Sequence, residues 1–111
     1  MRFHPVCDAD ALWENELAEF NVDGHEIILV RRIGGDYVAF QALCPHQDIP
    51  LVEGAFEDGV ITCRAHLWQF DGSTGAGVNP ADCRLAQYPV KIEGEKVCVS
   101  VEGVVPVRVG G

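Results

Sequence analysis

The sequence contains no long hydrophobic run. None of its apolar stretches reaches the ~18–20 residues that a membrane-spanning helix needs. Residues 1–5 contain neither an apolar signal-peptide core nor a twin-arginine pattern. We therefore expect no membrane association and no export, which leaves the cytoplasm as the expected location.

Basic residues are scarce. Lys and Arg together number 8 against 17 Asp and Glu, giving a formal net charge of −9 at pH 7. The phosphates of nucleic acids and of anionic membranes would repel such a chain, so we expect neither as a partner. The charge suits a small carrier that is steered to basic patches on larger proteins, although an acidic surface that only maintains solubility would look the same.

Patterns typical of catalysis are also missing. The sequence shows no nucleophile–base pair, no nucleotide-binding loop and no carboxylate dyad. We therefore expect no substrate-converting site and hence no enzyme. At 111 residues the chain fits one domain, residues 1–111, and is too small to contain a separate cofactor domain.

Most of the sequence has the pattern of short β-strands separated by 12 Gly and 6 Pro. The one helical signal is at residues 8–14, where Asp8 could cap a short turn before Leu12 and Trp13, and we assign Trp13 to the packing of the fold. This pattern predicts an all-β fold, an antiparallel β-sandwich, with residues 44–86 as a small inserted subdomain. The expected strands are residues 26–33, 37–43, 59–62, 67–70, 88–93 and 96–101.

Two short motifs each combine one cysteine with one histidine. They are Cys44-Pro45-His46 and Cys63-Arg64-Ala65-His66, sixteen residues apart, and each lies where a predicted strand ends in a loop. A Rieske-type [2Fe–2S] cluster has two Cys on one iron and two His on the other. One thiolate and one imidazole from each loop would clasp such a cluster from opposite sides. We therefore predict that Cys44, His46, Cys63 and His66 bind a [2Fe–2S] cluster.

Zinc is the main alternative, because two Cys and two His also form a tetrahedral structural site. Zinc sites usually group Cys with Cys and His with His along the sequence, whereas the pairs here are mixed. Three cysteines remain outside the motifs. We expect Cys98 to pack as a small apolar side chain, Cys7 has no assigned role, and Cys83 lies close enough to Pro80 for a role near the cluster.

Several longer stretches resemble Rieske ferredoxins, and more narrowly the ferredoxin component of toluene/aromatic multicomponent monooxygenases. The similarity covers nearly the whole chain, including residues 88–90 and 94–99, which match the closing strands of the domain. The most specific stretches are Cys-Pro-His-Gln at 44–47, Cys-Arg-Ala-His-Leu-Trp at 63–68, Phe-Asp-Gly-Ser-Thr-Gly at 70–75 and Asn-Pro-Ala-Asp-Cys at 79–83.

The resemblance implies a Rieske-type β-sandwich and a soluble one-electron carrier, and a monomer is the expectation for such a mobile carrier. It would accept electrons from an NADH-dependent flavin and iron–sulfur reductase and pass them to a diiron hydroxylase, which would bind the aromatic substrate. Both contacts would be transient. Two alternatives stay open: a ferredoxin of an aromatic ring-hydroxylating dioxygenase, and a small subunit of the nitrite-reductase type.

Departures from the respiratory branch of the family bear on the reduction potential. Those proteins have a disulfide between the cluster loops, at positions that correspond here to Ile49 and Ala65, and cluster-facing hydroxyls, at positions that correspond to Trp68 and Phe70. Fewer hydrogen bonds to sulfur destabilise the reduced state, so we predict a potential at the low end of the Rieske range, roughly −150 mV. Trp68 could shield the cluster or contact a partner, or it could pack beneath its loop.

Overall fold

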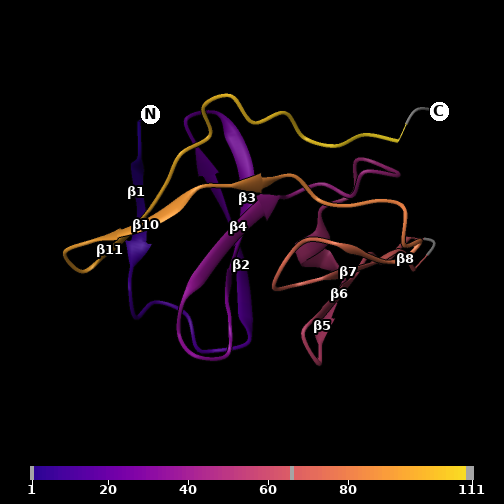
Figure 1. The fold of residues 1–111 in the computed structure, drawn as a ribbon, viewed down its shortest axis with the longest axis horizontal. Coiled ribbons are helices and arrows are strands. Elements are labelled where there is room, and N and C mark those ends of the chain that lie inside the picture. The colour runs from indigo at the N-terminus through magenta and orange to yellow at the C-terminus, as the bar shows by residue number, and fades with distance from the viewer. Residues whose placement is uncertain (1, 66, 110–111) are drawn as a thin grey trace.

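The computed structural model describes residues 2–65 and 67–109 (Figure 1). Within these ranges the chain forms short strands and one 3₁₀ turn, η1, and contains no helix that is long and apolar enough to cross a membrane. The elements are β1 (His4–Asp8), β2 (Glu16–Val22), β3 (His25–Arg31), β4 (Tyr37–Gln41), η1 (Leu51–Glu53), β5 (Ala55–Glu57), β6 (Val60–Thr62), β7 (Gln69–Asp71), β8 (Gly77–Asn79), β9 (Gln87–Tyr88), β10 (Val90–Glu93) and β11 (Lys96–Val99).

The strands form three antiparallel sheets. The first has the order β1-β11-β10, the second β2-β3-β4-β9 and the third β5-β6-β7-β8. Figure 1 shows the first and third sheets on opposite sides of the second. In the chain the third sheet comes between β4 and β9, which are hydrogen-bonded neighbours in the second sheet. The predicted all-β antiparallel fold with an insertion is confirmed, while the limits of residues 44–86 stay a prediction.

The second sheet is the middle layer, because β3 and β4 are buried on both faces. Successive residues of these strands point alternately to two hydrophobic clusters, as the period of a strand requires. Burial on both faces explains why β3 has a continuous apolar run. One cluster contains Ile28, Val30, Val38 and Phe40 with Ile61 and Phe70 of the third sheet; the other contains Ile27, Leu29, Tyr37 and Ala39 with Val97 and Val99 of the first.

Asp8 ends β1 and residues 9–14 form turns, bends and irregular backbone, so the predicted helical turn is wrong. The Leu12 carbonyl accepts a hydrogen bond from the Arg31 guanidinium at 2.7 Å, and the Asn15 amide donates to the Arg31 carbonyl at 2.7 Å. The segment is therefore tied to the end of β3. Leu12 is buried by this arrangement, but the side chain of Trp13 is 80% exposed, so the assignment of Trp13 to the packing of the fold is also wrong.

The strand prediction missed four strands, β1, β2, β5 and β8. Each of them lies at the edge of a sheet and is only partly covered, and β1, β2 and β8 lack a clean alternation of buried and exposed residues, while β5 has only three residues. The strand expected at residues 88–93 is divided into β9 and β10 at Pro89, which has no amide hydrogen to donate to a ladder. The hairpin turns expected at Gly34-Gly35 and Gly94-Glu95 are present, with positive φ at all three glycines.

Gly54 is the position at which the turn η1 touches the start of the second Cys–His loop. A Cβ atom on Gly54 would lie 1.9 Å from the Thr62 carbonyl oxygen and 3.2 Å from the Arg64 amide nitrogen. The φ of Gly54 is −89°, so the need for glycine here is steric. Nearby, the Arg64 side chain forms an ion pair with Glu53 at 2.8 Å, which joins the same two segments.

We predict that Gly54→Ala destabilises the protein and lowers its cluster content. The added methyl group must push η1 away from the backbone of Thr62. Such overpacking lowers the free energy of unfolding by about 1–3 kcal/mol. Gly94→Ala is the matched control: nothing lies within 4 Å of its Cβ position, and only its φ of +61° is strained. Urea unfolding and iron content per chain measure the two effects. Equal iron content in the two variants would contradict the role given to Gly54.

Candidate metal centre

The two Cys–His motifs form loops that are closed in the same way. The Cys44 amide donates to the Ile49 carbonyl at 3.0 Å, and the Cys63 amide donates to the Trp68 carbonyl at 2.8 Å. In each loop the cysteine therefore bonds to the residue five positions later, which turns the backbone back on itself. This shared geometry places the cysteine at the base of each loop, and in the first loop it places His46 in the turn.

The first loop follows β4 and is anchored at its base. The Leu51 amide donates to the Ala42 carbonyl at 2.8 Å, and Leu43 pairs with Pro50 in an antiparallel bridge. Cys44 is 2% exposed, whereas His46 is half-buried. The loop thus presents a buried thiol and an imidazole nearer to the surface.

The second loop follows β6, and its base is equally buried. Cys63 is 1% exposed, while Leu67 at the outer end of the loop is 66% exposed and has a φ of +54°. The fourth predicted ligand, His66, lies outside the described residues, so its predicted role stays untested. Phe70 is fully buried, in the same hydrophobic cluster as Cys44 and Cys63.

The two loops bring Cys44 and Cys63 together as free thiols in one hydrophobic cluster. The pKa of the Cys63 thiol is raised, mainly because the thiol is buried. The neighbouring Cys44 thiol also raises this pKa, and a hydrogen bond from the Ala65 backbone partly opposes the two effects. Two adjacent, unbridged thiols fit the two-Cys iron of a Rieske cluster. Metal ions bind cysteine as the thiolate, so a bound iron would take the place of the two protons and neutralise the buried negative charge. Within the described residues, no group of three or more Cys, His, Asp and Glu is arranged to hold a metal ion.

His46 is linked to the second loop through an aromatic contact. The imidazole stacks on the indole of Trp68, with ring centroids 4.6 Å apart and an angle of 15° between the planes. Trp68 is half-buried and also packs against the cluster of core residues that contains both thiols. It therefore contacts a predicted ligand of the other loop and the core beneath it at the same time.

Cys83 lies near the thiol pair, but in a third loop. Cys83 packs against the hydrophobic cluster that contains Cys44 and Cys63, and burial is the main cause that raises the pKa of its thiol. The Cys83 carbonyl accepts a hydrogen bond from the Gly77 amide at 2.8 Å, and a Cβ on Gly77 would lie 2.2 Å from that oxygen. Cys98 is buried in β11, which confirms its expected role as a small apolar side chain.

Sequence reasoning missed Gln41, although a signal was present. Gln41 is a polar residue in the buried strand β4, and a buried amide needs partners for all its polar atoms. Its side chain is 3% exposed and bonds to backbone groups of three other segments. One of these segments is the C-terminal stretch, for which the sequence predicts no element.

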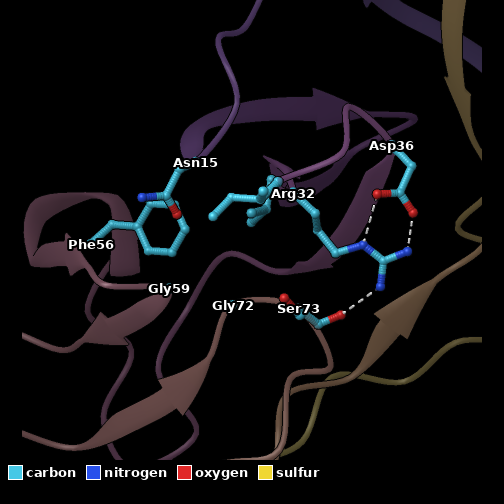
Figure 2. Close-up of a pocket in the computed structure, with 9 residues that line it drawn as sticks. Asn15, Arg32, Asp36, Phe56, Gly59, Gly72 and Ser73 are labelled. Carbon is cyan, nitrogen blue, oxygen red and sulfur yellow. Dashed lines mark hydrogen bonds and ion pairs between the residues drawn. The ribbon is translucent and has the colours of Figure 1, made fainter.

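No described residue of either Cys–His loop lines the pocket drawn in Figure 2. Its volume is about 390 Å³, and its walls come from the turn after β3 and from turns of the third sheet. Arg32 crosses its rim: the guanidinium donates to Asp36 and to the Ser73 carbonyl, and the hydrogen bond to Asp36 lowers the pKa of that carboxyl. Among the residues that the structure describes, those lining this pocket include no Cys or His.

Comparison with known proteins agrees with this geometry. The family model described as "Rieske [2Fe-2S] domain" matches residues 2–89. The ferredoxin component of an alkene monooxygenase system from Xanthobacter autotrophicus is 45% identical over 98 residues, covering 87% of this chain and 80% of that protein. The ferredoxin component of biphenyl 2,3-dioxygenase from Rhodococcus jostii is 39% identical over 104 residues, covering 93% and 96%.

A solved structure gives the same result for the fold. The ferredoxin of carbazole 1,9a-dioxygenase from Nocardioides aromaticivorans superposes with a TM-score of 0.77 at 30% identity, covering 90% of this chain and 98% of that chain. The predicted cofactor, a Rieske-type [2Fe–2S] cluster, and the predicted role as an electron carrier are confirmed by these relatives. The chain belongs to the Rieske [2Fe–2S] domain family.

Proposed function

We propose that Cys44 and Cys63 ligate one iron of the cluster and that His46 and His66 ligate the other. The observation that carries this assignment is the pairing of two identically closed loops, whose cysteines meet as adjacent buried thiols. A bound [2Fe–2S] cluster supplies reversible one-electron chemistry at this place. The low potential expected from Trp68 and Phe70, which have no hydroxyl group, stays a prediction.

We further propose that the carrier receives electrons from an NADH-dependent reductase and delivers them to the diiron hydroxylase of a monooxygenase system. The alkene monooxygenase ferredoxin supports this assignment through its 45% identity. A ring-hydroxylating dioxygenase is the second candidate, because the biphenyl dioxygenase ferredoxin aligns over 96% of its own length. In neither case would this chain convert a substrate itself.

The surface beside the metal centre supports a transient partner. His46 and Trp68 are half-buried there, and Leu67 is 66% exposed at the outer end of the second loop. An exposed apolar side chain next to a redox centre can anchor a small, short-lived interface. The net charge of −9 would steer the carrier toward basic partner surfaces. We propose a monomer that acts in the cytoplasm.

The ligand assignment predicts that Cys44→Ser and Cys63→Ser each abolish cluster assembly. Cys83→Ser is the matched control, because Cys83 is also half-buried near the site but lies in a different loop. Iron and acid-labile sulfide per chain, together with visible absorbance, measure assembly. Full loss of iron in Cys83→Ser, or normal iron in either of the other variants, would contradict the assignment.

The partner proposal is tested by reconstitution. Purified carrier is combined with NADH, its reductase and either a diiron hydroxylase or a Rieske dioxygenase, and NADH-dependent product is measured. We expect product with the diiron hydroxylase at a rate that saturates with carrier concentration, and none when Cys63→Ser replaces the carrier. Product with the dioxygenase alone would overturn the monooxygenase assignment in favour of the second candidate.

A further inference from the structure

The C-terminal residues 105–109, here called the strap, cross the molecule without forming a regular element. Figure 1 shows this yellow segment running from the first sheet toward the loop that follows β4. The strap lies beyond residues 2–89, the part of the chain that the family model matches.

Gln41 holds the strap at Val107. The Gln41 side-chain amide donates to the Val107 carbonyl at 3.0 Å, and its oxygen accepts from the Val107 amide at 2.8 Å. The same side chain also donates to the Leu43 carbonyl at 2.8 Å and accepts from the Ala86 amide at 2.8 Å. The Gln41 side chain thus pairs with both backbone groups of Val107, as a neighbouring strand would. It also connects Val107 to Leu43 and Ala86, which lie at the two ends of the inserted region.

Beyond Val107 the strap reaches the first ligand loop itself. The Val109 amide donates to the carbonyl of Pro45 at 2.9 Å. Pro45 stands between Cys44 and His46, so this hydrogen bond acts on the backbone between two proposed ligands. The adjacent Arg108 forms an ion pair with Asp48 at 3.0 Å, at the outer side of the same loop.

Polar contacts hold the strap in place more than burial does. The side chains of Val105 and Val109 are 80% and 43% exposed, which leaves little apolar area to stabilise the segment. The Arg108–Asp48 pair is also exposed, at 73% and 52%, and such pairs are weak and screened by salt. The buried Gln41 amide is therefore the strongest attachment, and the Val109–Pro45 hydrogen bond is its direct link to the loop.

We propose that Gln41 and the strap position the first ligand loop, so that Cys44 and His46 are held ready for the cluster and water is kept from the loop's backbone. Gln41 and Val109 are positioning residues, because their hydrogen bonds to this segment go to backbone carbonyls, those of Leu43 and Pro45. Ligands held by a rigid surrounding shell lose their metal more slowly than ligands on a free loop. This inference rests on the proposed assignment of Cys44 and His46 as ligands.

Val109→Pro tests the link in the holoprotein, because proline removes the amide hydrogen that bonds to Pro45. Val109→Ala is the matched control, since it keeps that hydrogen and shortens an exposed side chain. We expect roughly twofold to tenfold faster cluster loss to an iron chelator in Val109→Pro, and faster hydrogen exchange of the peptide containing residues 44–49, relative to Val109→Ala. Because solvent near the cluster stabilises its more charged, reduced state, the midpoint potential should rise as well.

Gln41→Met provides an independent variant at the other end of the strap. Methionine has a similar length but leaves the Ala86 and Val107 backbone groups without their partner, so we expect cluster loss to quicken by roughly tenfold or more. The proposal would be overturned if Val109→Pro and Gln41→Met lost their cluster, and exchanged the amide hydrogens of residues 44–49, at the same rates as the native protein. Hydrogen exchange in residues 44–49 does not depend on any partner enzyme, so failure of the reconstitution assay would leave this result intact.

Discussion

The structure depends on the meeting of two buried thiols at the ends of two hairpin loops. Each loop turns back through a hydrogen bond from its cysteine amide to a carbonyl five residues later, and the same hydrophobic cluster surrounds both cysteines. Other features keep the loops together. Gly54 allows η1 to lie against Thr62, and the stack of His46 on Trp68 joins the outer parts of the loops. A buried, dry pair of thiols is costly to ionise unless a metal compensates the charge, so the fold and the cofactor are coupled.

The sequence predicted the all-β fold with an insertion and the [2Fe–2S] cofactor, because both depend on local patterns, whereas the ligand roles of Cys44 and Cys63 stay predictions. Short runs of β-branched residues between glycines indicate strands, and a mixed Cys–His pair restricts the metal chemistry. The predicted turn of helix at residues 8–14 was wrong, since Arg31 and Asn15 bind this segment to β3. The exposure of Trp13 could not be predicted either, because it depends on which side of that turn faces solvent. Tertiary contacts decided both.

Gln41 is a second residue whose tertiary contacts could not be predicted from the sequence. A polar residue within the apolar run of β4 signals a buried hydrogen-bond network, but the sequence does not say which segments join it. The partners lie 45 and 66 residues away, at Ala86 and Val107. Through them a strand of the middle sheet, the end of the insertion and the C-terminal strap are fixed to the base of the first ligand loop. These contacts are the basis of the proposal that the surrounding framework positions the first loop.

Mixed ligation by one thiolate and one imidazole from each loop is the central claim. Its most direct test is pulsed electron paramagnetic resonance of the reduced protein, which detects nitrogen nuclei bound to the iron that takes up the electron. The account predicts two histidine nitrogens in the native protein and one in His46→Cys, if that variant retains a cluster. A spectrum of the native protein without bound nitrogen, as an all-cysteine cluster would give, or with no paramagnetic centre after reduction, would contradict it.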